Sequence, residues 1–158
     1  MTLTGAVVVA SNRASSGVYE DTTGPLIVAF LDGLGFAVGP PAVVPDGDPV
    51  RDAISAAVAA GARVVLTTGG TGLTPTDRTP EATRPLLDRE IPGIAEAIRA
   101  AGVAKGVPTA VLSRGLAGLV GTCLVVNLPG SRGGVKDGLA VVVPLLRHAV
   151  EQIVGSDH

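Results

Sequence analysis

Short apolar runs bounded by glycine or proline, which alternate with longer amphipathic stretches, most constrain how this chain can fold. Residues 6–10 (AVVVA) are apolar at every position, as expected of a strand buried on both faces of a sheet. Residues 63–68 and 123–128 also predict central strands. Residues 36–44 contain two adjacent prolines, which cannot donate to a strand ladder, so this run predicts an edge or broken strand.

The longer stretches carry apolar residues three and four positions apart, the spacing of one helix face. Residues 24–34, 49–60 and 94–102 predict three such helices. The clearest stripe lies in residues 135–153, where Pro144 is expected to kink the helix or to split it in two.

Strands that alternate with helices predict an α/β fold, a three-layer α/β/α domain around a mostly parallel central sheet. A chain of 158 residues fits a single domain, 1–158, and residues 155–158 are expected to be a frayed tail. Only 2% of the residues are aromatic, so aliphatic side chains must build the core.

Composition and charge exclude several classes of function. Bases need aromatic side chains on which to stack and phosphates need clustered cations, so a chain this poor in rings, with a net charge of −2, is not expected to bind nucleic acid. One cysteine, Cys123, and two histidines exclude a zinc site of recognisable spacing, and Cys123 is expected in the core. No run approaches the ~18 apolar residues of a membrane span, and no basic segment marks a signal peptide. We therefore expect a cytoplasmic protein without a membrane partner.

A glycine-rich segment after the third predicted strand, residues 69–79 (GGTGLTPTDRT), is the strongest functional signal. Its glycines let the backbone approach a ligand, and its amides and hydroxyls can surround an anion. Thr79 is predicted to cap the next helix, with Pro80 and Glu81 in the first turn. The pattern indicates a phosphate or a phosphorylated ligand, but a tight turn without a ligand explains it about equally well.

A second glycine-rich loop, residues 130–134, follows the last predicted strand. Its Arg132 can donate two hydrogen bonds to one phosphate, although an ordinary solvated arginine is the alternative. Ligands of an open parallel sheet bind outside the carboxyl ends of the strands. Two such loops at one edge suit a nucleotide together with a second phosphorylated ligand.

Two aspartates stand near these loops: Asp46 follows the second predicted strand, and Asp77 lies inside the glycine-rich segment. Both could hold Mg²⁺, which prefers one or two carboxylates together with phosphate oxygens. The alternative for Asp46 is a cap of the helix that begins near Pro49, and the alternative for Asp77 is a local turn.

Several familiar catalytic motifs are missing from the sequence. It contains no GxxxxGK[ST], no GxGxxG after a strand and no GxSxG. Phosphoryl and nucleotidyl transfer require positioning and charge neutralisation rather than a protein nucleophile, so this chemistry is favoured.

Five segments, in order along the chain, resemble the motifs of one known family. They are residues 11–21 (SNRASSGVYED), 44–46 (VPD), 69–83 (GGTGLTPTDRTPEAT), 112–115 (LSRG) and 127–131 (NLPGS). The chain is similar, nearly end to end, to the Mog/MoaB family of molybdenum-cofactor biosynthesis proteins, whose signature is shared with the G domain of gephyrin.

The resemblance implies Mg²⁺-dependent transfer of AMP from ATP to the terminal phosphate of molybdopterin, with release of pyrophosphate. It implies Asp46 and Asp77 as the catalytic, metal-linked acids, a homotrimer, and contact with other molybdenum cofactor synthesis or insertion proteins. The substrate-binding residues that it implies are Ser11, Arg13, Gly69, Gly70, Thr71, Gly72, Thr79, Pro80, Glu81, Ser113, Arg114, Gly115, Asn127, Pro129, Gly130 and Ser131. The alternative is a non-catalytic molybdopterin-binding or scaffold protein of the same pathway.

The resemblance also divides the site between the two substrates. Residues 69–72, Ser113 and Arg114 are expected to line the pterin and its phosphate. Asn127, Pro129, Gly130 and Ser131 are expected to border the nucleotide.

The chain departs from the family pattern at two places. Many relatives carry an arginine directly before the loop aspartate, whereas here Thr76 precedes Asp77 and Arg78 follows it. Asn12 stands where aspartate is common, which removes a charge from the site.

Overall fold

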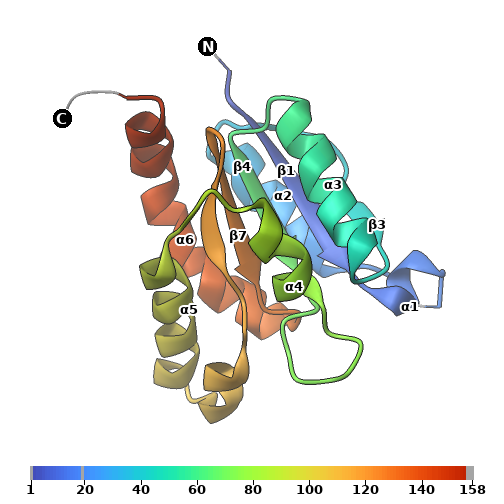
Figure 1. Ribbon diagram of the computed structural model, residues 1–158. Helices are drawn as coiled ribbons and strands as arrows, with labels where there is room; N and C mark the ends of the chain where they lie inside the picture. Colours follow the sequence, from blue (N-terminus) through green and yellow to red (C-terminus); the bar gives the residue numbers. More distant parts are fainter. Residues whose placement is uncertain (1, 19, 156–158) are drawn as a thin grey trace.

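A seven-stranded mixed sheet forms the centre of the protein in a computed structural model that describes residues 2–18 and 20–155 (Figure 1). The strand order is β2-β1-β4-β7-β6-β5, and β3 also pairs with β1. β1, β2, β3, β4 and β7 pair in parallel, and β6 and β5 add an antiparallel edge. The strands are β1 (Thr4–Ala10), β2 (Ala37–Val38), β3 (Ala42–Val44), β4 (Val64–Thr68), β5 (Arg89–Glu90), β6 (Ala117–Val120) and β7 (Cys123–Leu128). The predicted mostly parallel sheet is therefore confirmed.

The register of the central strands brings their carboxyl ends to one level. Val9 of β1 pairs with Thr68 of β4, and Thr68 pairs with Leu128 of β7. The segments that follow these three strands therefore emerge side by side at one edge of the sheet.

Helices cover both faces of the sheet, as predicted (Figure 1). Those over the first face, α2, α5 and α6, enclose alternate strand residues such as Val7 and Val9. The other face is covered by α3 and α4, which pack over Val8, Ala10 and Val65. The helices are α1 (Asn12–Ser15), α2 (Thr23–Gly33), α3 (Asp48–Ala59), α4 (Thr79–Thr83), α5 (Pro92–Ala104) and α6 (Arg132–Ile153), with the short 3-10 helices η1 (Arg84–Leu86) and η2 (Pro108–Leu112).

Prolines lie in the broken edge strand and in the last helix, with different effects. The prolines at positions 40 and 41 separate β2 from β3, which confirms a broken edge strand. α6 continues through Pro144 and is not split, because the buried stripe that includes Leu139 and Leu146 packs against the sheet on both sides of the proline. Of the predicted tail 155–158, only Gly155 lies within the described residues, and it ends the turn after α6.

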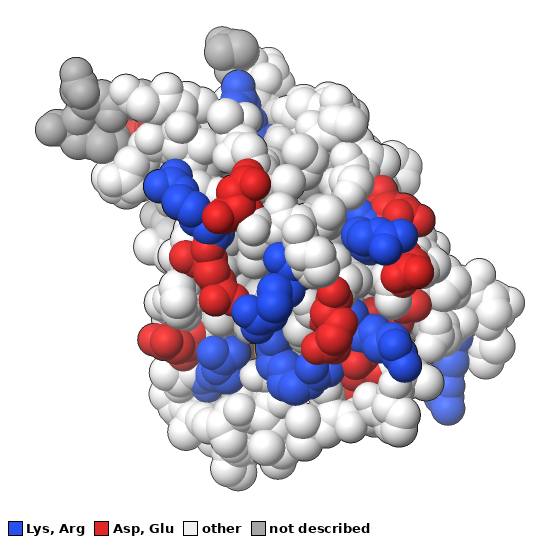
Figure 2. Space-filling model, in the orientation of Figure 1, with Lys and Arg blue, Asp and Glu red and all other residues white. Residues whose placement is uncertain are grey.

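Basic and acidic side chains are intermixed on the face of the molecule that carries α3 and α4 (Figure 2). Several form ion pairs, including Arg84 with Glu90 at 3.1 Å. Opposite charges therefore partly neutralise one another on this face. No helix of the described residues is both long and apolar enough to cross a membrane.

Candidate functional site

A pocket of about 590 Å³ opens at the carboxyl edge of the sheet. Its walls come from the segment after β4, from α5 and η2, and from the segment after β7 with the start of α6. The predicted site residues that line it are Gly70, Thr71, Gly72, Asp77, Ser113, Pro129, Gly130 and Ser131. Residues expected to border the pterin and residues expected to border the nucleotide thus meet in one cavity.

The remaining predicted residues do not line this pocket. They are Ser11, Arg13, Asp46, Gly69, Thr79, Pro80, Glu81, Arg114, Gly115 and Asn127. Most of them lie directly beside it, and their hydrogen bonds show that they shape its walls.

The glycine loop, residues 69–78, needs glycine at its first two positions. Gly69 and Gly70 have φ of +89° and +68°, in the left-handed region that favours glycine. A side chain at Gly69 would also overlap the Ala10 carbonyl oxygen, and one at Gly70 would overlap the Asp46 carboxylate. The loop backbone therefore packs directly on its neighbours.

Asp46 lies half-buried at the end of β3 and ties the glycine loop to the start of α4. Its Oδ2 accepts a hydrogen bond from the Arg78 amide at 2.8 Å, and its Oδ1 accepts from the Thr79 hydroxyl at 2.9 Å and from the Gly47 amide at 2.7 Å. The predicted helix cap at Thr79 is therefore wrong: Arg78 is the N-cap residue, and the Thr79 hydroxyl binds Asp46 instead. Gly47, not Asp46, occupies the cap position of α3.

Asp77 lies half-buried in the wall of the pocket. Its Oδ2 accepts a hydrogen bond from the Thr74 amide at 3.0 Å, which closes the turn between these residues. Asp77 can therefore form the turn through Oδ2 and also line the pocket. Its Oδ1 has no hydrogen-bond partner recorded among the described residues. The two aspartates touch neighbouring parts of one loop, Asp46 at Gly70 and Asp77 near Gly72.

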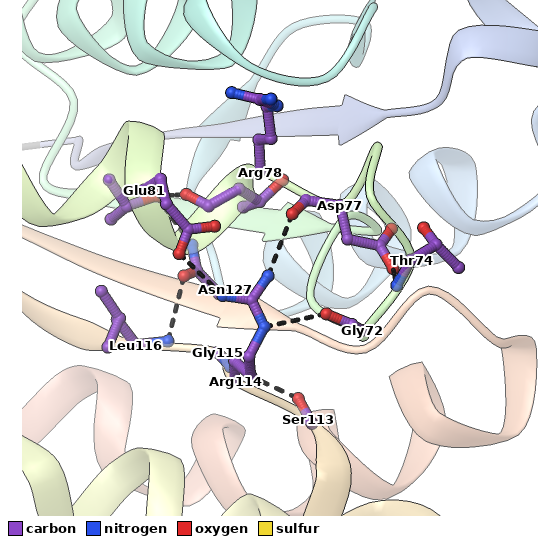
Figure 3. A network of polar contacts seen from close by, with 12 residues as sticks. Gly72, Thr74, Asp77, Arg78, Glu81, Ser113, Arg114, Gly115, Leu116 and Asn127 are labelled. Carbon is purple, nitrogen blue, oxygen red and sulfur yellow. Dashed lines mark hydrogen bonds and ion pairs between the residues drawn. The ribbon is translucent and has the colours of Figure 1, made fainter.

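Arg114 holds the glycine loop from the other side (Figure 3). Its Nε donates to the Gly72 carbonyl at 2.8 Å and its Nη2 to the Asp77 carbonyl at 3.0 Å, while Nη1 pairs with Glu81 at 2.7 Å. The Arg114 amide also donates to the Thr71 carbonyl at 2.8 Å. All three guanidinium nitrogens of Arg114 therefore bind the glycine loop or the start of α4.

Asn127 is buried behind the pocket, with 3% of its surface exposed. Its Oδ1 accepts from the Leu116 amide at 3.0 Å, and its Nδ2 donates to the hydroxyls of Thr67 at 2.9 Å and Thr83 at 3.2 Å. Thr83 in turn donates to the Thr79 carbonyl. Asn127 therefore joins β7 to β4, to α4 and to the residue before β6, and buries no unpaired side-chain polar atom.

A second cavity, of about 210 Å³, lies next to the first at the ends of β1 and β4. Ser11, Gly69, Gly130 and Arg132 line it, and Gly130 lines both cavities. Thr68 Oγ1 donates to the Pro129 carbonyl at 2.7 Å, which holds the loops after β4 and β7 together. Arg13 lies exposed on α1 and lines neither cavity.

One wall of the main pocket was not predicted from the sequence. It consists of Ile98, Arg99 and Gly102 on α5 and of Val107 and Ala110 around η2. These residues are mostly apolar and follow no motif, so only the approach of α5 and η2 to the glycine loop identifies them. Cys123 is buried as expected, and burial raises the pKa of its thiol to about 12, so it is no nucleophile.

Comparison with known proteins assigns the family. Residues 6–148 match a family model described as "Probable molybdopterin binding domain". The chain belongs to this family. It is 38% identical, over 153 residues, to the molybdopterin adenylyltransferase of Pyrococcus furiosus, which covers 92% of this chain and 90% of that protein. The solved structure of the molybdopterin biosynthesis Mog protein from Mycobacterium ulcerans is 50% identical, with a TM-score of 0.92 over 96% of this chain and 99% of that one.

Longer relatives contain the same domain. The chain is 40% identical over 153 residues to the molybdenum cofactor biosynthesis bifunctional protein of Synechococcus elongatus, covering 96% of this chain but 48% of that protein. The chain thus spans about half the length of the bifunctional relatives that it matches.

The ion pair between Arg114 and Glu81 predicts a pH-dependent contribution to stability. The hydrogen bond from Arg114 lowers the pKa of the Glu81 carboxyl below its ordinary value of 4.5, so the contribution is present above that value and is lost as the pH falls through the folded-state pKa. We expect Glu81→Gln to lower the free energy of unfolding by about 0.2–1 kcal/mol near pH 7, because the pair is solvent-exposed. Urea denaturation at about pH 7 and about pH 3 measures the difference.

Glu96→Gln is the matched control for this measurement. Glu96 is an exposed carboxylate on α5 and forms no ion pair among the described residues. A stability difference for Glu81→Gln that is the same at both pH values would show that the ion pair is not its cause.

Proposed function

We propose that this chain is a molybdopterin adenylyltransferase. A phosphate oxygen of molybdopterin attacks the α-phosphorus of ATP, and the bond from that phosphorus to the pyrophosphate leaving group breaks. The observation that carries the proposal is the main pocket, in which the glycine loop and the segment after β7 meet. A relative named molybdopterin adenylyltransferase, which aligns over nine-tenths of both chains, supports it.

The pocket supplies what phosphate chemistry needs from a protein. Adenylyl transfer depends on alignment of the two substrates and on neutralisation of charge. The glycine loop offers backbone amides free of side chains, and Ser131 caps α6 through a hydrogen bond from the Gly134 amide at 3.0 Å. Both are sites at which oxygen anions bind favourably.

Asp77 fits the role of a Mg²⁺ ligand. Its Oδ1 has no partner recorded among the described residues, and Asp77 lines the pocket, so the carboxylate can join phosphate oxygens around the ion. The ion would stabilise the charge that develops on the reacting phosphates. Asp46 already accepts three hydrogen bonds from the protein, so we propose that it acts on the reaction chiefly by holding the glycine loop and α4.

The shortage of aromatic side chains indicates how the rings are bound. Aromatic residues make up 2% of the chain, and none lines the main pocket within the described residues. We propose that the pterin and adenine lie against backbone, glycine surfaces and aliphatic side chains such as Ile98, Val107 and Leu112.

A non-catalytic molybdopterin-binding protein is the second candidate. The matched family is described by binding alone, and Asp46 does not line the pocket. The two functions differ in whether adenylyl-molybdopterin forms when ATP and Mg²⁺ are added.

Substitution of Asp77 tests the proposed transfer. Asp77→Asn removes the charge that would hold Mg²⁺ and should lower kcat by roughly 100-fold or more, measured as adenylyl-molybdopterin formed from molybdopterin, ATP and Mg²⁺. Asp32→Asn, an exposed change on α2, is the control for net charge. Tight molybdopterin binding by the unaltered protein without any product would instead favour the binding function.

Substitution of Asp46 separates positioning from binding. Asp46→Asn replaces one acceptor with a donor and must break a hydrogen bond to Arg78, Thr79 or Gly47. We expect kcat to fall more than the affinity for molybdopterin, because the loop loses its alignment. A large loss of affinity at unchanged kcat would make Asp46 a binding residue.

We further propose that the active protein is a cytoplasmic homotrimer. Exposed apolar side chains near η2, which include Val103, Val111 and Leu112 with 42%, 60% and 48% of their surface accessible, support burial in an interface. Sedimentation equilibrium should give three times the mass of the 15.6 kDa chain, and a mass of one or two chains would contradict the proposal. Contact with other molybdenum cofactor synthesis or insertion proteins stays a prediction.

A further inference from the structure

Arg99 of α5 is the only arginine or lysine among the described residues that line the main pocket. The other arginines near this edge do not line this pocket. Arg114 is bonded to the glycine loop, and Arg132 lines the second cavity, where it donates to the Thr22 carbonyl. Arg78 extends away from Gly72 and Arg114 in Figure 3, and its stem lies beside Gly47.

Two hydrogen bonds hold the Arg99 guanidinium in place. Nη1 donates to the carbonyl oxygens of Ser113 and Gly115, each at 3.2 Å. Nε and Nη2, which share another edge of the planar group, have no partner recorded among the described residues. Two parallel N–H donors on a half-buried, anchored arginine match the geometry of a phosphate group.

The charges around the pocket favour the same ligand. The other charged residues that line it are Asp77 and Asp137, both carboxylates. Arg99 therefore supplies the only positive charge among the side chains described in the lining, and without it these side chains alone would disfavour a phosphorylated ligand.

We propose that Arg99 pairs with a phosphate group of the ligand in the main pocket and so decides that a phosphorylated ligand binds there. The inference rests on the proposed function only for the identity of the ligand. ATP and molybdopterin share this chemistry, and their binding can be measured separately. This phosphate-binding role could not be predicted from the sequence, because Arg99 lies among small apolar residues of a helix and belongs to no motif.

Paired ligands with and without phosphate provide the test. Isothermal titration calorimetry compares ATP with adenosine, and molybdopterin with its dephosphorylated form, on the full chain and on Arg99→Met. Loss of a charge-assisted pair should weaken at least one phosphorylated ligand by about 10- to 100-fold while its phosphate-free partner changes by less than about twofold. Arg99→Lys keeps the charge without the two-donor edge and should cause a smaller loss. Lys105→Met removes a cation from the end of the same helix, outside the pocket, and is the matched control.

The outcomes separate the two sources of phosphate and the two proposals. A loss confined to ATP assigns Arg99 to the nucleotide, and a loss confined to molybdopterin assigns it to the pterin phosphate. Unchanged affinities, or equal weakening of ligands with and without phosphate, would overturn the inference and leave Arg99 a structural role. Phosphate-selective loss in a protein that forms no adenylyl-molybdopterin would support Arg99 and reject adenylyl transfer.

Discussion

The parallel backbone ladder that joins β1, β4 and β7 is the constraint on which the functional edge depends. Burial on both faces sets its register, because a shift of one residue would exchange the side chains of the two helical layers. With Val9, Thr68 and Leu128 level, the loops that follow can touch. Thr68 reaches the Pro129 carbonyl, and Gly130 packs on Gly69 so closely that a Cβ atom there would lie 3.1 Å from the Gly69 Cα.

The polar side chains around the glycine loop have divided roles. A glycine-rich segment loses much conformational entropy when it is ordered, so an ordered loop needs many compensating contacts. These contacts come from Asp46, Arg114 and Asn127. Most hydrogen bonds of each side chain are made with the loop or with the strands and helix beside it. Asp77 and Arg99, which line the pocket, keep polar atoms without a partner recorded among the described residues, namely Oδ1 of Asp77 and Nε and Nη2 of Arg99. Rigid support behind a glycine surface is what precise alignment of two phosphorylated substrates requires.

The parts of the fold that the sequence predicted are those with a long, regular pattern. The all-apolar run of β1 and the helical stripe of α6 each extend over enough residues to be unambiguous. β5 and β6 were missed because they have only two and four residues. β5 pairs with β6, which lies far along the chain, whereas β6 forms a tight antiparallel hairpin with β7. Thr79 and the residues after it match the local pattern of a helix cap. The Thr79 hydroxyl instead donates a hydrogen bond to Asp46, which lies in a different part of the chain.

By itself the sequence determined the alternation of strands and helices, the glycine loop and its aspartate, and the resemblance to one family, because each is carried by residues close together along the chain. Only the tertiary structure decided which polar residues line the pocket and which hold its walls in place. Arg114 and Arg99 are both arginines near the pocket, but the first donates to Gly72 and Asp77. The second lines the cavity and donates only through Nη1, to Ser113 and Gly115, among the described residues. That distinction depends on which carbonyl groups packing places within 3.2 Å of each guanidinium, and no pattern along the chain encodes such a distance.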